Sequence, residues 1–231
     1  GGKAVGIDQE SWTDFDKNPE RNLYVIWHRL ASGSYHPQSV REVEIPKKDG
    51  SRRKLGIPTL RDRIAQQVIK DYMEKRIDKL FHENSYGYRP LKSAHQAVEQ
   101  VGQNNFGFDW VIDMDISKFF DEVDHALILK ALSHVIEQKW VVMYVERWLK
   151  MPVQKKDGTT EPNQGKGTPQ GGVISPILAN LYLHFSMDKW LSKHYPTIRF
   201  VRYADDVVIH CLTQQQAEQV KEALINRLGR K

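Results

Sequence analysis

Cysteine is almost absent from this 231-residue chain, in which Cys211 is the only example. A single cysteine cannot form an internal disulfide, and such chains are typical of reducing compartments. The nine histidines show none of the spacings of a zinc site, and no cysteine pair is present to help them. We therefore exclude a disulfide-stapled secreted fold and a zinc module, and we expect a cytoplasmic location.

Long hydrophobic runs are also missing. No stretch approaches the ~18 apolar residues that cross a membrane, and the N-terminus lacks the basic start and apolar core of a signal peptide. No linker or low-complexity tract interrupts the chain. The sequence opens on glycine instead of methionine, so we expect a piece of a longer protein that makes no contact with a membrane.

Negative charge is scarce in one segment. The chain carries 34 Lys and Arg against 29 Asp and Glu, a formal net charge of +5. Residues 41–63 hold eight cations and four acids, so this segment alone contributes +4. A local basic block indicates contact with phosphates. A solvent-exposed edge hairpin, whose Lys and Arg side chains prevent pairing with other strands, gives the same pattern. Composition does not distinguish this hairpin from a phosphate-binding surface.

Strand and helix patterns follow one another irregularly. Residues 40–58 alternate apolar and charged positions around Asp49-Gly50, which predicts a hairpin, and the polar stretch 153–172 predicts a second hairpin or loop. Apolar strands are predicted before residue 115 and on both sides of residues 205–206. Amphipathic helices are predicted over residues 61–81, 93–101, 125–136 and 139–150, and from residues 175 and 213 onward. Because no βαβ rhythm is present, we predict an α+β fold with an antiparallel sheet.

The helix predicted over 61–81 carries a regular apolar stripe. Ile64, Val68, Tyr72 or Met73, Ile77, and Leu80 or Phe81 recur at helical spacing, which predicts an amphipathic helix with a polar outer face.

Three acids in two segments raise the question of function. The stretch RFVRYADDVVIH places Asp205 and Asp206 between two strand-like runs. Asp tolerates turn geometry, so a simple polar turn explains the pair without any chemistry. Asp115 ends the strand predicted in WVIDMDISKFF, 90 positions before Asp205. Only tertiary structure brings these carboxylates together, and together they form a site for divalent cations.

Phosphoryl transfer from a nucleoside triphosphate needs such a site. Two Mg²⁺ ions about 3.5–4 Å apart activate the attacking hydroxyl and stabilise the leaving pyrophosphate. Mg²⁺ takes oxygen ligands in near-octahedral geometry, so carboxylates on neighbouring strand ends and substrate phosphates complete its shell. Carboxylates this close repel one another, which a bound cation relieves.

Several ordered motifs resemble one known family. DMDISKFFD, GTPQGGVISPILANLYL and RYADD are similar to successive palm motifs of reverse transcriptases, above all to the bacterial enzymes encoded within group II introns. RRKLGIPTLRDRIAQQ and SYGYRPLKSAHQAV resemble fingers and upper-palm segments of that group. The likeness runs from about Gly6 to about Gly229. YADD alone is a weak signal, whereas the ordered set is specific.

The resemblance implies a right-hand polymerase with fingers, palm and an antiparallel palm sheet. We expect fingers and the start of the palm over residues 1–95 and the palm over 96–231, with fingers elements recurring around 138–170. The thumb that follows the palm in this family is absent from the 231 residues. We therefore expect a fingers–palm piece, and whether the piece alone is active is left open.

The resemblance also assigns the acids. Asp115 and Asp205 are implied as the principal ligands of two Mg²⁺ ions, for which Mn²⁺ is a substitute, and the Ile116 carbonyl as an assisting ligand. Asp206 is implied as a further catalytic carboxylate and metal ligand near the primer end. Asp113 faces the same way as Asp115 by strand alternation, and for it we expect a structural or solvated role.

Nucleotide contacts follow from the same resemblance. Phe120 is implied to pack under the incoming sugar and exclude a 2′-OH, although a core Phe beside Phe119 is the alternative. Gln170 matches a glutamine that lies near the incoming nucleotide. Lys47 and Arg53 match fingers residues that clamp the triphosphate, with Lys48, Arg52 and Lys54 as alternatives. The remaining implied template, primer or RNA contacts are Arg52, Lys54, Gly171, Gly172 and Tyr203.

We therefore predict the RNA-directed DNA polymerase core of a group II intron-encoded protein, which also assists intron splicing and mobility. The alternative is a module that acts mainly as an RNA-binding splicing cofactor, or maturase. The implied partners are template and intron RNA, a DNA primer and dNTPs, in the bacterial cytoplasm, and a homodimer is left open. A reverse transcriptase domesticated for another task also stays open, whereas a palm-like cyclase has no need of the PQGG turn and the basic fingers.

Overall fold

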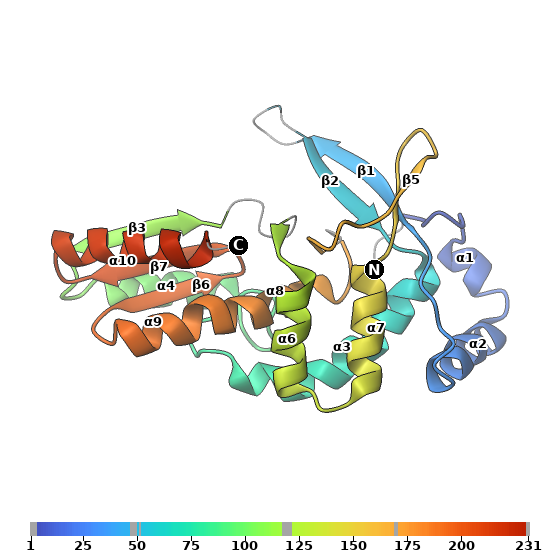
Figure 1. The fold of residues 1–231 in the computed structure, drawn as a ribbon, viewed down its shortest axis with the longest axis horizontal. Helices are drawn as coiled ribbons and strands as arrows, with labels where there is room; N and C mark the ends of the chain where they lie inside the picture. The colour runs from blue at the N-terminus through green and yellow to red at the C-terminus, as the bar shows by residue number, and fades with distance from the viewer. Residues whose placement is uncertain (1–3, 47–49, 51, 117–121, 169–170, 230–231) are drawn as a thin grey trace. The chain divides into compact units, whose positions relative to one another are not determined.

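The chain forms two compact units in the computed structural model, which describes residues 4–46, 50, 52–116, 122–168 and 171–229. The first unit consists of Gly1–Glu74 and Phe120–Ser175, and the second of Lys75–Phe119 and Pro176–Lys231. Each unit contains one sheet (Figure 1). Both units are discontinuous in sequence, because residues 75–119 lie between the two parts of the first unit and residues 120–175 lie between the two parts of the second.

The first unit carries helices whose ends are capped by polar side chains. Ser11 accepts a hydrogen bond from the Asp14 backbone N–H in a capping box, and Asn18 precedes a proline that opens the next helix. Asp124 accepts hydrogen bonds from the first backbone N–H groups of a third, as its position in the sequence predicts. The helices are α1 (Trp12–Phe15), α2 (Pro19–Ala31), α3 (Leu60–Ile77), α6 (His125–Val135) and α7 (Lys139–Leu149).

The sheet of the first unit is four-stranded, in the order β2-β1-β4-β5. The predicted hairpin is present as β1 (Val40–Pro46) and β2 (Arg52–Ile57), which pair antiparallel from Arg41↔Ile57 to Pro46↔Arg52. The second predicted hairpin forms from β4 (Val153–Gln154) and β5 (Thr160–Glu161). A two-residue parallel pairing of β1 with β4 joins the hairpins into one sheet.

The buried face of α3 agrees with the predicted one only in part. Met73 and Ile77 of the predicted stripe are 0% exposed, whereas Val68 is 53% exposed and the neighbouring Ala65 and Ile69 are buried. Positions 64, 68 and 72 and positions 65, 69 and 73 all carry apolar residues, so two neighbouring stripes satisfy the same helical period. The stripe of Ala65, Ile69 and Met73 is the buried one.

The second unit combines a three-stranded sheet with helices. Its helical elements are η1 (Asp78–Leu80), α4 (Ala94–Asn104), α8 (Ser175–Leu183), the π-helix η2 (His184–Asp188), α9 (Lys189–His194) and α10 (Gln214–Leu228). Its strands are β3 (Trp110–Asp115), β6 (Arg199–Tyr203) and β7 (Asp206–Cys211), in the order β3-β7-β6. All neighbours in this sheet pair antiparallel, which confirms the predicted antiparallel sheet.

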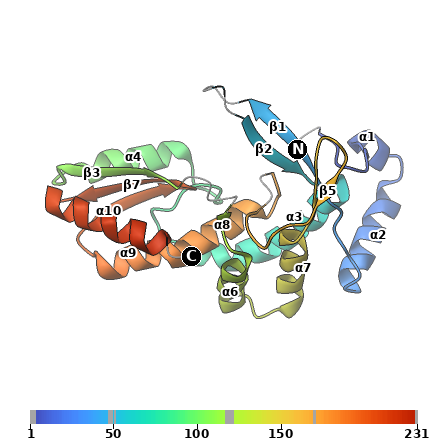
Figure 2. The same ribbon diagram turned by 45° about the horizontal axis from the view of Figure 1, so that its top comes forward.

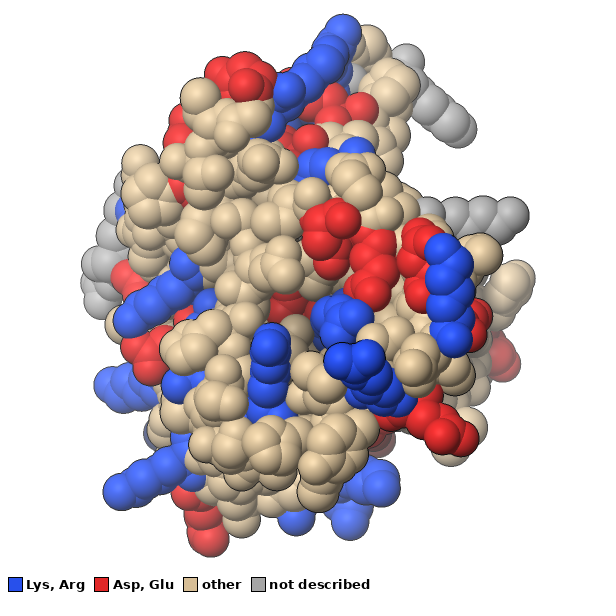
Figure 3. Space-filling model, turned by 90° about the vertical axis from the view of Figure 1, so that its right-hand side faces the viewer, with Lys and Arg blue, Asp and Glu red and all other residues tan. Residues whose placement is uncertain are grey.

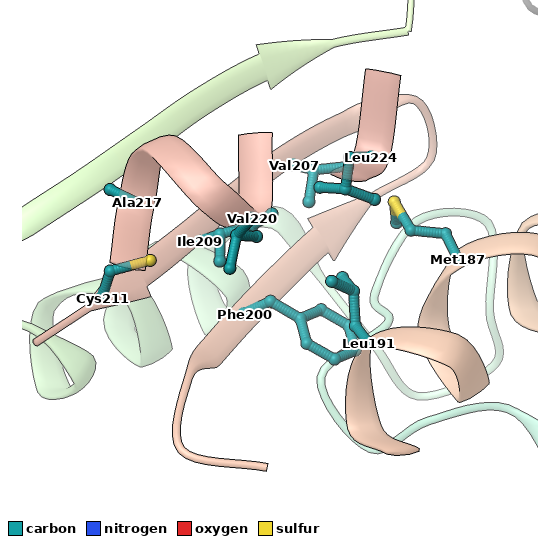
Figure 4. Packing of buried hydrophobic residues seen from close by; sticks show 9 residues of the cluster. All are labelled: Met187, Leu191, Phe200, Val207, Ile209, Cys211, Ala217, Val220 and Leu224. Atoms are coloured by element: carbon teal, nitrogen blue, oxygen red, sulfur yellow. The ribbon is translucent and has the colours of Figure 1, made fainter. Parts of the chain in front are cut away.

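Strand alternation gives the sheet of the second unit two covered faces. Helices α9 and α10 lie on one face and α4 on the other (Figure 2). Phe200, Val207 and Ile209 point toward Leu191 of α9 and Val220 of α10 (Figure 4). The smaller cluster of Tyr86, Ala97 and Val201 fills the α4 side. None of the described helices is long and apolar enough to span a bilayer.

Candidate active site

The sheet of the second unit brings the predicted acids together. Antiparallel pairing of β3 with β7 places Asp115 directly opposite Asp206. One residue further on, the Ile116 backbone N–H donates a hydrogen bond to the Asp205 carbonyl oxygen at 3.2 Å. Two segments 90 positions apart therefore meet at one end of the sheet, as the motifs predict.

The turn between β6 and β7 is tight. Tyr203 pairs with Asp206, so only Ala204 and Asp205 lie between the strands. Ala204 has a φ of +58°, a left-handed conformation that costs a non-glycine residue about 1–2 kcal/mol. Tyr203, Asp206 and Asp115 occupy opposed positions on the three strands and therefore project from one face. All three side chains are exposed, so this face presents two carboxylates and a phenol to solvent.

A buried arginine holds this turn in place. Arg202 is 0% exposed and binds Asp188 of η2 through two parallel hydrogen bonds, Nε to Oδ1 at 2.9 Å and Nη2 to Oδ2 at 2.7 Å. Its third nitrogen, Nη1, donates to the Ala204 carbonyl at 3.1 Å and to Asn180 Oδ1 at 2.7 Å. The guanidinium therefore fixes the backbone of the left-handed residue that precedes Asp205.

The same network reaches a loop beside the turn. Asn180 Nδ2 donates to the Gly87 carbonyl at 2.7 Å. Gly87 packs so closely that a Cβ there would meet the Ala204 backbone nitrogen. Two backbone segments approach this closely only where one of them is glycine, so Gly87 sets the distance between loop and turn.

The acids influence one another electrostatically. The pKa of Asp206 is raised, first by partial desolvation of its carboxyl against the sheet and then by the charges of Asp205, Asp115 and Asp113. Like charges that raise a carboxyl pKa indicate a place where a cation is favourable. No three His, Cys, Asp or Glu side chains in the described part of the chain are arranged as a complete metal-ligand set. The oxygen-only donors still fit a hard divalent cation, which keeps waters and takes ligands from substrate phosphates.

The basic hairpin of the first unit has two distinct faces. Arg52 Nη1 lies 2.7 Å from Glu44 Oε2 and Lys54 Nζ lies 3.5 Å from Glu42 Oε1, so both cations pair with acids across the hairpin. Arg53 alternates to the opposite face and is exposed. Arg61, from the same basic block, binds both carboxylate oxygens of Glu10 at 2.8–2.9 Å.

Surface charge is accordingly mixed. On the face shown in Figure 3, Lys and Arg are interspersed with Asp and Glu instead of forming one basic field. The net charge of segment 41–63 therefore overstates the positive charge available on its surface.

Of the remaining predicted residues, two glycines are described by the structure and the others lie outside the described ranges. Gly171 has a φ of +110°, and a Cβ there would lie 2.9 Å from the Gly56 carbonyl oxygen of β2. Its neighbour Gly172 is buried and accepts a hydrogen bond from the Ser175 backbone N–H. The positive φ and the close approach to Gly56 explain why position 171 needs glycine, whereas a carbonyl acceptor at position 172 does not require one. Lys47, Lys48, Phe119, Phe120, Asp121 and Gln170 lie outside the described residues.

Sequence reasoning missed the buried network of Arg202, Asp188 and Asn180. One signal was present, because Arg202 shares strand parity with Phe200 and therefore points toward the core. A charged residue at a core-facing position needs a buried partner. The sequence did not indicate which acid, since Asp188 belongs to a π-helical turn that has no simple pattern.

Comparison with solved structures identifies the class of fold. The chain superimposes on apo telomerase from Candida tropicalis with a TM-score of 0.64, at 11% identity, over 87% of this chain and 46% of that one. The fold is thus that of the right-hand polymerases that the motifs implied.

Sequence comparison identifies the family. Residues 45–231 match the family described as reverse transcriptase (RNA-dependent DNA polymerase), and the chain belongs to it. Protein YkfC of Escherichia coli K12 is 31% identical over 96% of this chain. The group II intron-encoded protein LtrA of Lactococcus lactis subsp. cremoris is 32% identical over 83% of it. The chain spans 67% of the first relative and 31% of the second. The family uses divalent metal ions.

Proposed function

We propose that the chain is the catalytic core of a group II intron-type reverse transcriptase, which extends a DNA primer with dNTPs on an RNA template. The single observation that carries the proposal is the register of β3 and β7, which sets Asp115 against Asp206 and Ile116 against Asp205. We assign the second unit, whose sheet carries the acids, to the palm, and the basic hairpin of the first unit to the fingers.

In this proposal the acids share the metal ions. Asp115 and Asp205 would hold two Mg²⁺ ions, for which Mn²⁺ could substitute, and the Ile116 carbonyl would assist. The chemistry that such ions would supply is activation of the primer hydroxyl and stabilisation of the leaving pyrophosphate. Asp206 adds negative charge near the primer end, and the raised pKa of its carboxyl supports a site that a cation completes. Tyr203 shares their exposed face and is suited to contact the primer backbone.

The nucleotide contacts remain those that the family resemblance implies. Lys47 and Arg53 clamp the triphosphate, and strand alternation places Arg53 on the face of the hairpin opposite to that of Arg52. Phe120 and Gln170 select the sugar of the incoming nucleotide. Arg52, Lys54, Gly171 and Gly172 are the proposed template or RNA contacts.

Substitution of one carboxylate tests the polymerase proposal. Asp205→Asn should lower primer extension on an RNA template by roughly 100-fold or more, because it removes a charged metal ligand. The assay uses the longest form of the protein that its gene encodes. The matched control is Asp109→Asn, which removes the same charge from an exposed position just before β3 and should leave extension unchanged. Extension by Asp205→Asn at the control's rate would refute the proposal.

We further propose that the full protein binds its intron RNA and assists splicing and mobility in the bacterial cytoplasm. The relationship to LtrA and the sequence pI of about 9.1 support RNA binding. The Asp115→Ala/Asp205→Ala double variant should bind the intron RNA as tightly as the parent, with an affinity that falls steeply as salt rises. Loss of RNA affinity in this variant would assign the binding to the catalytic centre itself.

A further inference from the structure

The loop that follows Tyr86 passes directly beside the turn that carries the acids. The Tyr86 backbone N–H donates a hydrogen bond to the Arg202 carbonyl at 2.8 Å, which ties the start of the loop to β6. One residue later, a Cβ at Gly87 would overlap the Ala204 backbone nitrogen. Consecutive Cα atoms are about 3.8 Å apart, so Tyr88 begins one such step from a direct backbone contact with the turn.

This loop reaches the turn on the face of the sheet that presents the acids. The Tyr86 side chain packs against Val201, and Val201 shares strand parity with Tyr203. Tyr203 lies opposite Asp206 in the strand pairing, and both side chains are exposed. Tyr88, two residues after Tyr86, therefore lies close to the exposed carboxylates.

Both neighbours of Tyr88 are held in place by side chains of the second unit. The Gly87 carbonyl accepts a hydrogen bond from Asn180 Nδ2 at 2.7 Å. The Arg89 side chain is 8% exposed, and it donates from Nε to Asp78 Oδ1 at 2.7 Å and from Nη2 to the Asp78 carbonyl at 3.0 Å. A side chain between two fixed neighbours is pre-organised, so it loses little conformational freedom when a partner binds.

The backbone of Tyr88 has a conformation that favours a different residue. Its φ is +56°, in the left-handed region that glycine adopts at no steric cost and asparagine tolerates. The side chain is 58% exposed, and its hydroxyl has no hydrogen-bond partner among the described residues. Packing within the second unit therefore does not explain an aromatic residue here. Unfavourable backbone conformations of this kind cluster at active sites and ligand clamps.

We propose that Tyr88 contacts the duplex of template and primer beside the primer end and helps to hold it against the acids. This inference rests on the proposed function, because the acids define where the primer ends. A tyrosine ring offers a large apolar surface at low cost in conformational entropy, and its hydroxyl can donate to the acceptors that base pairs present in the minor groove. Every nucleotide has an apolar face, so the contact tolerates any sequence, as copying requires.

Leu91 provides a matched control in the same loop. Its φ is +60° and its side chain is 98% exposed. Leu91→Gly therefore relieves the same kind of backbone strain and removes an exposed apolar side chain, as Tyr88→Gly does. The two positions differ in their place, because Tyr88 adjoins the contact with the turn and Leu91 lies beyond the anchored Arg89.

Equilibrium binding and thermal unfolding, measured on the same variants, test the proposal. The longest form of the protein that its gene encodes is titrated in EDTA with a fluorescent duplex of RNA template and DNA primer. Tyr88→Gly should weaken duplex binding about tenfold, as expected for the loss of one aromatic contact to a nucleotide. Its Tm should equal or exceed that of the parent, because the left-handed strain is relieved. Tyr88→Phe keeps the ring and should retain most of the affinity, and Leu91→Gly should bind as the parent does.

Primer extension separates a duplex contact from a role in shaping the turn. Tyr88→Gly should raise the KM for the duplex about tenfold and leave kcat and the KM for dNTPs unchanged, since it removes binding that is equal in the ground and transition states. Loss of kcat at saturating duplex would assign Tyr88 to the turn instead. Tyr88→p-benzoylphenylalanine should crosslink on irradiation to the last few base pairs before the primer end.

The outcomes distinguish failure of this inference from failure of the polymerase proposal. Loss of extension in Asp205→Asn, together with parent-like duplex binding by Tyr88→Gly, would overturn this inference alone. Equal weakening by Leu91→Gly would also overturn it, since the effect would then come from the loop conformation. A Tm of Tyr88→Gly more than about 4 °C below the parent's would do the same by showing a structural role. Full extension by Asp205→Asn with weakened binding by Tyr88→Gly would refute the polymerase proposal and support the duplex contact.

Discussion

Two arginine–carboxylate pairs, Arg202–Asp188 and Arg52–Glu44, have the same N–O distance of 2.7 Å and opposite surroundings. Both side chains of the first pair are 0% exposed, whereas those of the second are 69% and 39% exposed. Exposed pairs contribute about 0–1 kcal/mol, while breaking a buried pair costs about 3–5 kcal/mol. The buried pair fixes the turn that carries the acids, and the exposed pair leaves a cation that a phosphate can recruit.

Breaking the buried pair should give the largest effect. Arg202→Met leaves the Asp188 carboxylate buried without its partner and should lower the free energy of unfolding by about 3–5 kcal/mol. Urea denaturation measures this loss. Arg202→Met/Asp188→Leu removes both charges and should recover much of it. A loss below about 1 kcal/mol in the single variant would show that the hydrogen bonds of the Arg202 guanidinium do not hold the turn.

Acid should destabilise the second unit through His184. This side chain is 6% exposed, and burial lowers its pKa to about 4, against about 6.5 in an unfolded chain. The folded state therefore binds the proton less tightly, so stability is full above about pH 6.5 and is lost as the pH falls toward 4. The loss amounts to at most about 3 kcal/mol.

His184→Phe isolates this contribution. The His184 Nδ1 has no hydrogen-bond partner in the described part of the structure, and the ring packs against Phe81 and Phe185. Phe can occupy this position without a titrating group, so urea denaturation between pH 7 and 4 should give a flatter profile. Burial also lowers the pKa values of His82 and His210, so some slope should remain. An identical slope in the variant would contradict the assignment.

Forcing the loop at Gly87 away from the turn between β6 and β7 should have an intermediate effect on the free energy of unfolding. Gly87→Ala places a methyl group against the Ala204 backbone, and overpacking of this kind costs about 1–3 kcal/mol. Thermal unfolding measures the loss. Gly102→Ala in α4 is the matched control, since nothing lies within 4 Å of the added methyl and alanine favours a helix. Equal stabilities of the two variants would mean that the loop yields without cost.

Breaking the exposed pair should give the smallest effect. Arg52→Gln, Glu44→Gln and the double variant form a double-mutant cycle, in which we expect a coupling energy below about 1 kcal/mol. Addition of 0.5 M salt should remove what coupling there is. A coupling above about 2 kcal/mol would make the exposed ion pair comparable in energy to the buried one and would remove the contrast between them.

Much of the fold could be read from local patterns. The β6–β7 strands, the β1–β2 hairpin and the helices that open at Asp124 and Thr213 follow from period-two alternation, turn residues and caps. The meeting of Asp115 with the Asp205–Asp206 turn depends on pairing across 90 positions, and only the ordered motifs predicted it.

The rest depends on contacts that no local pattern encodes. The buried stripe of α3 was ambiguous because two neighbouring stripes are apolar. Arg61 belongs to the basic block in sequence, yet its partner is Glu10, 51 positions away. The Arg202 fork joins residues 14 and 22 positions apart through a π-helical turn. Neither α1 nor α2 was predicted. Helix α1 has only four residues, whereas α2 carries Leu23, Ile26, Trp27 and Leu30 at helical spacing after Asn18-Pro19, so its signal was present in the sequence.

The insertion of residues 120–175 between the halves of the second unit has a consequence for biosynthesis. During synthesis β3 is made before residues 120–175, and its partner β7 is made after them. The edge of β3 that pairs with β7 therefore has no partner while the first unit is completed. The acids then meet only when the final strands emerge from the ribosome. Limited proteolysis of stalled nascent chains that end before residue 206 should find β3 unprotected, and a translation product truncated there would lack the facing of Asp115 and Asp206 altogether.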